Sequence, residues 1–586
     1  MLTGLRTVPL IIIIHFFVFL VGGLYKPVWR FATLHSAVLI ARCTFLGTLI
    51  SLMGIYLLRP DPMLPRSIMV IFWFFSTFAV AVTRFAWRAW NDFQANLSRT
   101  SKPVCIIYGA GKCGDLLARH IDMTPKFPYQ AMGFIDDDIN KRHRIIHGLK
   151  VLGTGDELEN ICQLHSVHTV IIAIPSAPGR IVREIVARCQ AVGIKPLILP
   201  SLADSLGQNL FQPRPIDIKD LLRRSPKSID HEKIHSLLEG KVILVTGAGG
   251  SIGSELCRQI LQHKPDKLVL LDSSEFNLYH IDMELQDRYG AEIPIFPILG
   301  SVTDELTVQK VFSRFLPAMV FHAAAYKHVP VIESNPIQGI INNISGTKNV
   351  AEASVTFGVR KFLLISTDKA VNPTSIMGMT KRACELLIQS MHSLHTGSCS
   401  FSAVRFGNVL GSSGSVVPRF LDQIQSGGPV TVTHPEITRY FMLTSEAVGL
   451  VLQSTAMSKG GETFVLNMGE PVKIYDMAQQ IIRLAGKEPG RDIEIVFTGL
   501  RPGEKLYEEL IIKDTEKHIL HDEIYVAIPQ RFDEAMVLRT INEILKQASL
   551  GQEELSIRLL KAVISPIGTA LSDSAIKSRI ALDELI

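Results

Sequence analysis

The chain has 586 residues, of which 47% are hydrophobic, and this length predicts about three or four domains rather than one core. Its net charge of +5 is small for the length and gives no indication of nucleic-acid binding. Eight cysteines are scattered without a C-x-x-C spacing, so we expect neither a metal cluster nor a redox pair.

Residues 1–90 hold most of the apolar excess, in three runs at Val8–Tyr25, Ala37–Leu58 and Ile68–Val82. Each run is near or slightly below the ~20 residues that cross a bilayer. A cleaved signal peptide is one short run, so three runs in series predict about three transmembrane helices. Three buried helices of a soluble domain are the alternative.

Basic residues flank these runs unevenly. Lysine and arginine are held on the cytoplasmic side of membranes. They follow the first and third runs at Lys26, Arg30, Arg84, Arg88, Arg99 and Lys102, whereas Arg59 and Arg66 in the second loop oppose this orientation. We therefore expect the chain after residue 90 to lie in the cytoplasm.

A first α/β domain is expected over residues 103–205. The apolar run Val104–Tyr108 ends in a glycine turn, GAGKCG at Gly109–Gly114, and a helical pattern follows. Asp136 lies about twenty residues past the last glycine, where a ribose-binding carboxylate would sit. Nucleotide binding and a structural Rossmann-like spacer both remain open. Residues 206–239 have the composition of a linker.

A longer alternation of strands and helices covers residues 240–512 and opens with KVILVTGAGGSIG from Lys241. Glycines let the backbone approach a pyrophosphate, and a helix N-terminus offers it N–H groups and a favourable dipole. The turn therefore predicts a dinucleotide site. Its expected contacts are Gly247, Gly250, Ser251, Ile252 and Gly253.

Asp272 ends the next strand, about twenty residues beyond Gly253. A carboxylate there accepts hydrogen bonds from the adenosine ribose and repels a 2′-phosphate, which favours NAD over NADP. We include Ser273 in this site. The alternative role of the DSSE sequence is to cap the following helix.

Another strand, Val320–His322, ends in Ala323, Ala324 and Ala325. Small side chains at the carboxyl end of a strand leave room for a cofactor lying across the sheet. Asn343 follows on the next helix and is added to the predicted cofactor contacts.

The strand Phe362–Ser366 is expected to deliver the catalytic groups Thr367, Asp368 and Lys369. Lys381 on the following helix is placed to hold the nicotinamide ribose. Four residues earlier stands Met377, where such oxidoreductases usually have tyrosine, and methionine has no ionisable proton. Either another group, such as Asp368 acting through Thr367, drives the oxidation, or the chain binds nucleotide without catalysis.

Basic residues beyond the strands indicate an anionic substrate. Guanidinium pairs well with phosphate oxygens, so Arg439, Arg501 and Lys505, with Asn408, are candidates to clamp a diphosphate. The full predicted substrate site contains Lys327, Asn408, Pro418, Arg439, Arg501 and Glu504.

The remaining residues, 513–586, are polar and helical in pattern. They carry no motif that indicates chemistry. We expect a helical C-terminal tail.

Five segments carry a family resemblance. They are HAAAYKHVPVIESNP from His322, ISTDKAVNPT from Ile365, VRFGNVLGSSGSVVPRF from Val404, PEITRYFM from Pro435 and TGLRPGEKLYEELI from Thr498. Together they resemble the membrane-bound nucleotide-sugar 4,6-dehydratases of bacterial polysaccharide and glycan biosynthesis, within the extended short-chain dehydrogenase/reductase superfamily. The likeness is dense over about residues 240–512, and GLYKPVWR, GFIDDD and RPIDIKDLLRR extend it upstream.

The resemblance implies an α/β fold with N-terminal transmembrane helices, a small Rossmann-like domain, and a doubly wound NAD-binding domain with a smaller C-terminal substrate region. It implies conversion of UDP-N-acetylglucosamine to its 4-keto-6-deoxy derivative, with Asp368 as general acid, Lys369 as base and Thr367 as an orienting hydroxyl. It also implies a homo-oligomer that is a multi-pass protein of the bacterial inner membrane with a cytoplasmic catalytic domain.

Two positions bear on this resemblance. With Met377, the chain is similar to the longer family members, which also lack the tyrosine and retain configuration at carbon 5. Ser301 stands in LGSV, where the family usually has aspartate, so an adenine contact is expected to be weaker there. The rival functions are a nucleotide-sugar 4-epimerase and a membrane-tethered nucleotide-binding scaffold.

Overall fold

The computed structural model describes residues 8–25, 34–58, 66–97, 102–124, 126–165, 167–200, 211–221, 229–412, 414–511, 517–521, 523–527 and 532–565. Several predictions concern residues outside these ranges. These predictions involve the flanking charges Lys26, Arg30, Arg59 and Arg99, parts of the 206–239 linker, and residues 566–586 of the tail.

Three apolar helices form at the expected places: α1 (Val8–Val21), α2 (Leu34–Leu58) and α3 (Arg66–Leu97). Polar contacts join two of them, since Thr44 Oγ1 lies 2.7 Å from Thr77 Oγ1. Among the described residues, one stretch, Ala37–Ile55 in α2, is long and apolar enough to cross a membrane. The apolar parts of α1 and α3 are shorter, so this finding supports one candidate span and not three.

The first α/β sheet has the strand order β3-β4-β2-β1-β5-β6-β7, with parallel pairing from β4 through β6. Its strands are β1 (Val104–Tyr108), β2 (Gln130–Ile135), β3 (Ile145–Ile146), β4 (Leu149–Gly153), β5 (Thr169–Ile172), β6 (Lys195–Ile198) and β7 (Arg214–Pro215). The helices in this stretch are α4 (Lys112–Met123), α5 (Leu158–Leu164) and α6 (Gly179–Ala191). The β1–α4 turn is the predicted glycine turn.

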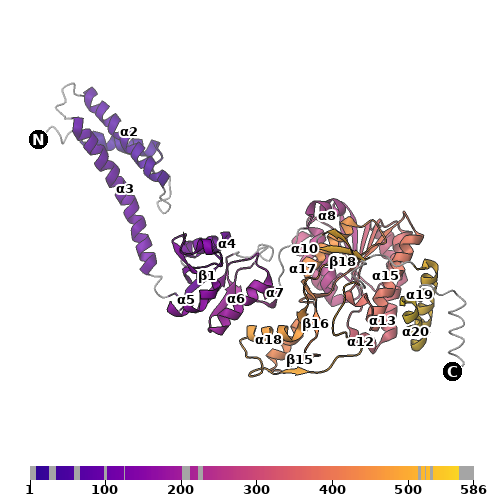
Figure 1. The fold of residues 1–586 in the computed structure, drawn as a ribbon. Coiled ribbons are helices and arrows are strands. Elements are labelled where there is room, and N and C mark those ends of the chain that lie inside the picture. Colours follow the sequence, from indigo (N-terminus) through magenta and orange to yellow (C-terminus); the bar gives the residue numbers. More distant parts are fainter. Residues whose placement is uncertain are drawn as a thin grey trace, which may run out of the picture. The chain divides into compact units, whose positions relative to one another are not determined.

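The second sheet contains β18, which is labelled in Figure 1. Its strand order is β10-β9-β8-β11-β12-β13-β18-β22-β21, and it is parallel from β10 through β18. Its parallel strands are β8 (Val242–Thr246), β9 (Lys267–Asp272), β10 (Ile295–Leu299), β11 (Met319–His322), β12 (Lys361–Ile365), β13 (Ser400–Arg405) and β18 (Thr463–Leu466). The strand order reverses direction between β8 and β11, which is where open α/β sheets bind ligands. The predicted doubly wound α/β fold is confirmed.

Helices connect and cover these strands. They are α8 (His231–Leu238), α9 (Ser251–Leu261), α10 (Glu275–Tyr289), α11 (Glu305–Phe315), α12 (Val329–Glu333), α13 (Pro336–Ile340), α14 (Gly346–Thr356), α15 (Ile376–Leu394) and α17 (Thr444–Met457). The short helix α7 (Ile218–Leu221) lies between β7 and α8 in the chain. A π-helical segment, η6 (Ile341–Ser345), precedes α14, and a short 3₁₀ turn, η7 (Asp368–Ala370), follows β12. The helix α15 is buried over most of its length.

A smaller region is built from three two-stranded sheets, β14-β17, β15-β20 and β16-β19. Its elements are β14 (Asn408–Leu410), α16 (Val416–Gln425), β15 (Val430–Val432), β16 (Thr438–Arg439), β17 (Phe441–Leu443), β19 (Val472–Lys473), α18 (Ile474–Leu484) and β20 (Ile495–Phe497). These elements carry Asn408 and Arg439.

The prediction of a purely helical tail was wrong. Strands β21 (Lys517–His521) and β22 (Ile524–Ala527) add an antiparallel hairpin to the edge of the second sheet beside β18. An edge hairpin needs only a short apolar stretch because backbone hydrogen bonds attach it, so its pattern is hard to recognise in sequence. The helices α19 (Glu534–Ser549) and α20 (Glu553–Ile564) then contribute Ile541, Ile544 and Leu560 to the core cluster that contains α15.

Candidate active site

The turn between β8 and α9 has the backbone geometry of a phosphate-binding turn. Gly247 has φ of 68°, and a Cβ there would lie 2.7 Å from the Ala324 nitrogen. A Cβ on Gly253 would lie 2.0 Å from the Gly247 oxygen, so only glycine lets α9 pack this closely. At Gly250, which caps α9, the nearest atom to a Cβ is 3.2 Å away. The turn is therefore tight where it meets β11 and more open at the helix N-terminus.

Asp272 stabilises this turn through hydrogen bonds. Its Oδ2 accepts a hydrogen bond from the Gly249 N–H at 2.8 Å, and its Oδ1 accepts one from the Ser274 N–H at 2.8 Å. Each carboxylate oxygen has a second lone pair, so both remain able to accept from ribose hydroxyls. The cap of α10 is Ser274, which accepts from the Asn277 N–H.

The β11 end is fixed by buried hydrogen bonds. His322 lies between Thr246 Oγ1, at 2.7 Å from Nδ1, and Thr347 Oγ1, at 3.1 Å from Nε2. Burial, together with the Lys381 ammonium, lowers the pKa of His322 to about 3, so this imidazole is neutral. Ala323 donates its N–H to the Thr246 oxygen at 3.0 Å, which aligns the alanine run with β8.

Asn343 holds the loop after the alanines. Its Oδ1 accepts from the Tyr326 N–H at 2.8 Å, and its Nδ2 donates to the Tyr326 oxygen at 3.1 Å and to Thr380 Oγ1 at 3.0 Å. Asn343 therefore links the loop to α15 through its side chain. Its position in a π-helical segment fits the frequent occurrence of such segments at functional sites.

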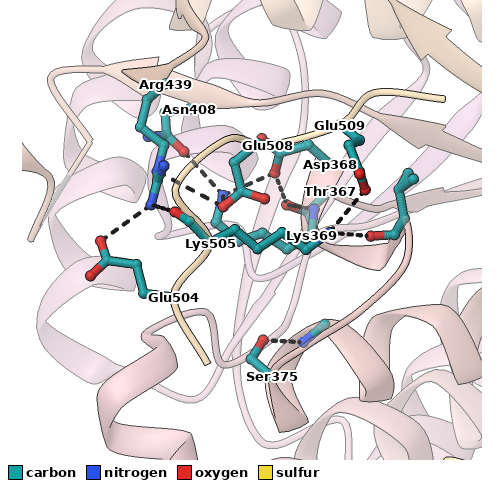
Figure 2. A network of polar contacts seen from close by, with 12 residues as sticks. Thr367, Asp368, Lys369, Ser375, Asn408, Arg439, Glu504, Lys505, Glu508 and Glu509 are labelled. Atoms are coloured by element: carbon teal, nitrogen blue, oxygen red, sulfur yellow. Dashed lines mark hydrogen bonds and ion pairs between the residues drawn. The ribbon is translucent and has the colours of Figure 1, made fainter. Parts of the chain in front are cut away.

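The predicted catalytic residues meet at the carboxyl end of β12 (Figure 2). Thr367 Oγ1 donates to Asp368 Oδ1 at 2.8 Å, and Lys369 Nζ donates to the same oxygen at 2.9 Å. Lys369 Nζ also donates to Asn408 Oδ1 at 3.2 Å. The predicted acid and base are thus in direct contact.

A further carboxyl group stands beside Lys369. Glu508 Oε1 lies 3.8 Å from Lys369 Nζ and 3.8 Å from Arg439 Nε. Although burial lowers the pKa of Lys369, the attraction of Asp368 and Glu508 outweighs it and raises the pKa overall. Lys369 is therefore an ammonium in the free protein at neutral pH, and it must give up a proton before it can act as a base.

The position of Lys381 on α15 contrasts with that of Lys369. Lys381 is buried, burial lowers its pKa, and it lies on the same helix as Met377. Met377 is buried in the hydrophobic core cluster, where it packs without a polar role. An ammonium buried away from water is costly, so Lys381 is suited to a ligand that supplies hydrogen-bond acceptors.

A cavity of ≈ 110 Å³ lies beside Lys369. Three of the four candidates to clamp a diphosphate line it: Arg439, Arg501 and Lys505. Arg439 is paired with Glu504 at 3.2 Å, and Lys505 with Glu509 at 3.1 Å. Small-molecule pockets usually have roughly 300–1,000 Å³, so a nucleotide sugar requires these ion pairs to separate or the loop to shift.

Lys327 and Pro418 lie outside this cavity. Lys327 is exposed in the loop after β11, and Pro418 is half-buried in α16. The cofactor residues Ser251 and Ile252 begin α9, half-buried, and Ser273 is exposed after β9. The roles of these five positions stay predictions.

Comparison with known proteins identifies the family. A model of polysaccharide biosynthesis proteins matches residues 243–529, and a model of CoA-binding domains matches residues 22–200. The capsular polysaccharide biosynthesis protein CapD of Staphylococcus aureus is 41% identical over 513 residues, which cover 87% of this chain and 85% of that protein. The chain belongs to the polysaccharide biosynthesis protein family.

Two kinds of enzyme resemble this family member over about half of the chain. An inverting UDP-N-acetylglucosamine 4,6-dehydratase of Campylobacter jejuni is 34% identical, covering 50% of this chain and 84% of that enzyme. A UDP-glucose 4-epimerase of Rickettsia rickettsii is 32% identical, covering 46% of this chain and 77% of that enzyme. The chain is related to nucleotide-sugar dehydratases and epimerases.

Sequence reasoning missed two residues of this family member's site. Glu508 is one of two adjacent glutamates in the LYEELI motif, and nothing in that pattern indicated which of them turns toward Lys369. Glu385 lies four residues after Lys381 and is fully buried, where it accepts from Ser366 Oγ at 2.7 Å and from Arg405 at 2.7 and 2.6 Å. Burial raises its pKa, yet Arg405 outweighs this and lowers the pKa to about 2. The ion pair fastens α15 to β12 and β13.

Proposed function

We propose that this protein is an NAD-dependent 4,6-dehydratase of a UDP-N-acetylhexosamine, with UDP-N-acetylglucosamine as the expected substrate. The observation that carries the proposal is the 2.9 Å contact between Lys369 and Asp368 beside a cavity lined by basic residues. An elimination needs an acid and a base on neighbouring carbons of one sugar, and adjacent ionisable side chains meet that need. The similarity to dehydratases supports the same reaction.

The cofactor site fits NAD. The open helix N-terminus at Gly250 suits a pyrophosphate, the Asp272 carboxylate suits ribose hydroxyls, and the buried Lys381 ammonium suits the nicotinamide ribose. NAD, when bound, takes hydride from carbon 4 and returns it to carbon 6. The carboxylate at Asp272 disfavours a 2′-phosphate, which makes NADP the less suitable cofactor.

Lys369 is the proposed base for the carbon 5 proton. Oxidation at carbon 4 makes that proton acidic, and Lys369 can first pass its own proton to Asp368 Oδ1, 2.9 Å away. A carboxyl group then protonates the departing carbon 6 hydroxyl. Asp368 is the carboxyl that the family resemblance assigns to this role. Met377 in place of tyrosine favours retention of configuration at carbon 5, as in the longer relatives.

An epimerase is the second candidate, because the chain also resembles a UDP-glucose 4-epimerase. Epimerisation oxidises carbon 4 but needs no acid for loss of water. The two functions are separated by incubating the full-length protein with NAD and UDP-N-acetylglucosamine and weighing the product. Dehydration gives a product lighter by one water. A product of unchanged mass with inverted carbon 4 would establish the epimerase.

The helix α2 suggests where this reaction takes place. Its apolar stretch Ala37–Ile55 is proposed to anchor the protein in the bacterial inner membrane, with α1 and α3 as further spans and the catalytic domain in the cytoplasm. Such an anchor keeps the product near membrane enzymes that use it. A homo-oligomer is also proposed from the family resemblance, and sedimentation of the purified protein tests it.

A further inference from the structure

The apolar helices α1 and α2 form a groove that contains one charged residue. The groove has a volume of ≈ 730 Å³, which is within the roughly 300–1,000 Å³ that small-molecule sites usually have. Arg42 is the only charged residue among the described residues that line it. Phe17, Phe45 and Leu46 also line it, and each of these side chains is at least half exposed. The groove is therefore open and is not part of a filled core.

Arg42 lacks an anionic partner in the part of the chain that the structure describes. It lies in the candidate span Ala37–Ile55 and is the only charged residue of α2. The helices α1 and α2 contain no aspartate or glutamate. The Arg42 side chain has no ion pair or hydrogen bond to another described residue. A charged side chain within a membrane span is costly, and such residues usually mark a functional site. The missing anion must therefore come from outside these helices.

The position of Arg42 along α2 matches the depth that suits a lipid phosphate. Arg42 lies about 8 Å along the helix from Ala37, where the candidate span begins, at a rise of 1.5 Å per residue. Long arginine side chains extend from such depths toward the membrane surface. The loop before α2 carries Lys26 and Arg30 in the sequence, so this end of α2 is the one expected at the cytoplasmic face. The guanidinium group can therefore meet the phosphates of the cytoplasmic leaflet.

The groove runs from Arg42 toward the middle of the span. A Cβ on Gly22 would lie 2.6 Å from Cys43 Sγ, so the chain after α1 packs closely on α2 beside Arg42. From there the lining continues to Ile50 of α2, about 12 Å further along the helix, and to Ile13 of α1. A cation at one end and apolar side chains along the rest complement an anionic headgroup that carries a hydrocarbon chain.

We propose that the groove between α1 and α2 binds an anionic phospholipid, with the phosphate on the Arg42 guanidinium and an acyl chain along the groove. Guanidinium donates two parallel hydrogen bonds to phosphate oxygens, which makes arginine well suited to this headgroup. The inference rests on the proposed membrane anchor and is independent of the sugar chemistry. A lipid bound in this way neutralises Arg42 and fixes the depth of α2 in the cytoplasmic leaflet.

The test measures the preference for an anionic headgroup. Full-length protein in mild detergent is mixed with equal amounts of phosphatidylglycerol and zwitterionic phosphatidylcholine of the same acyl chains, and native mass spectrometry gives the ratio of bound lipids. The parent protein should favour phosphatidylglycerol about fivefold, the effect of one arginine near the membrane surface. Arg42→Gln should abolish this preference, and Arg42→Lys, which keeps the charge, should retain part of it. The matched control Arg144→Gln, at an exposed arginine of the first α/β domain, should leave the ratio unchanged.

A second variant tests the apolar part of the groove. Leu46→Trp fills the groove and leaves Arg42 in place, so it should lower the amount of both bound phospholipids. Free glycerol phosphate, which has the phosphate without acyl chains, should not displace phosphatidylglycerol at equal concentration.

Equal binding of the two lipids by the parent protein, or an unchanged ratio in Arg42→Gln, would overturn the proposal. Displacement of phosphatidylglycerol by glycerol phosphate would also overturn it, because the groove would then not be used. A dimer that Leu46→Trp dissociates, with lipid binding unchanged, would assign the groove to a second copy of the chain. If salt alone releases the parent protein from membranes, the proposed anchor itself fails, and that failure is seen before any lipid is added.

Discussion

The two glycine turns of this chain have nearly the same backbone. Gly109 has φ of 110° and a Cβ on Gly114 would lie 2.0 Å from its oxygen, while Gly247 has φ of 68° and the Gly253 Cβ position lies 2.0 Å from its oxygen. In each turn a carboxylate from the next strand accepts a backbone N–H. Asp136 accepts from Ala110 at 2.7 Å, and Asp272 accepts from Gly249 at 2.8 Å.

The surroundings of the two turns differ. In the first, Asp136 is ion-paired with Lys141 at 3.1 Å, and the chain already supplies a cation to it. In the second, Asp272 accepts from the backbone N–H groups of Gly249 and Ser274, and the β12 end of the same sheet carries Thr367, Asp368 and Lys369. The glycine turn alone therefore identifies a Rossmann-like fold. Whether the site is catalytic depends on the residues at the ends of the other strands.

The largest effect that tests this comparison is expected at Lys369. Lys369→Ala removes the base and should lower the rate of dehydration about 10²- to 10⁴-fold, with NAD affinity retained because the lysine lies outside the glycine turn. Lys141→Ala in the first region should leave the rate unchanged. Steady-state assays and calorimetric titration with NAD measure both. Full activity of the Lys369 variant would show that the chemistry lies elsewhere.

A smaller effect is expected on stability at Glu385. Glu385→Gln breaks a fully buried ion pair and should lower the free energy of unfolding by about 3–5 kcal/mol. The partly buried Asp136–Lys141 pair of the first region should contribute at most about 1 kcal/mol. The denaturant midpoint of unfolding, followed through the loss of NAD binding, measures the effect of Glu385→Gln.

The pH dependence of that stability has a definite sign. The pKa of Glu385 is lowered to about 2 in the folded protein, so its contribution is present above the ordinary glutamate pKa of 4.5 and is lost as pH falls toward 2. The Glu385→Gln protein lacks this loss between those two values. Parallel acid titration curves for the two proteins would argue against the ion pair.

The smallest effect is expected at the middle glycines of the two turns. A Cβ at Gly250 meets only the Gly247 oxygen, at 3.2 Å, and one at Gly111 meets nothing within 4 Å, so both alanine variants should fold. Gly250→Ala should weaken NAD binding by about tenfold, or ~1.4 kcal/mol, because its methyl group crowds the pyrophosphate. Gly111→Ala should not change NAD affinity. An equal loss of NAD affinity in the Gly250→Ala and Gly111→Ala proteins would mean that NAD also binds the first turn.

The parts of this molecule that could be predicted from sequence are those with local patterns. The strand–glycine–helix units at Gly109 and Gly247 and the polar group at Thr367–Lys369 are contiguous in the chain. Glu508 could not be predicted as Lys369's neighbour, because they are 139 positions apart in the chain and only the tertiary fold brings them to 3.8 Å. The β21–β22 hairpin was missed because its pairing with β18 is set by backbone hydrogen bonds and not by side-chain pattern.

One experiment tests the central claim, that neighbouring ionisable groups remove a proton and expel a hydroxyl from the same sugar. The parent protein is given NAD and UDP-N-acetylglucosamine in heavy water, and the product is analysed by mass spectrometry. The account predicts a sugar nucleotide that has lost one water and carries one solvent deuterium at carbon 5. A product of unchanged mass without deuterium at carbon 5 would contradict it.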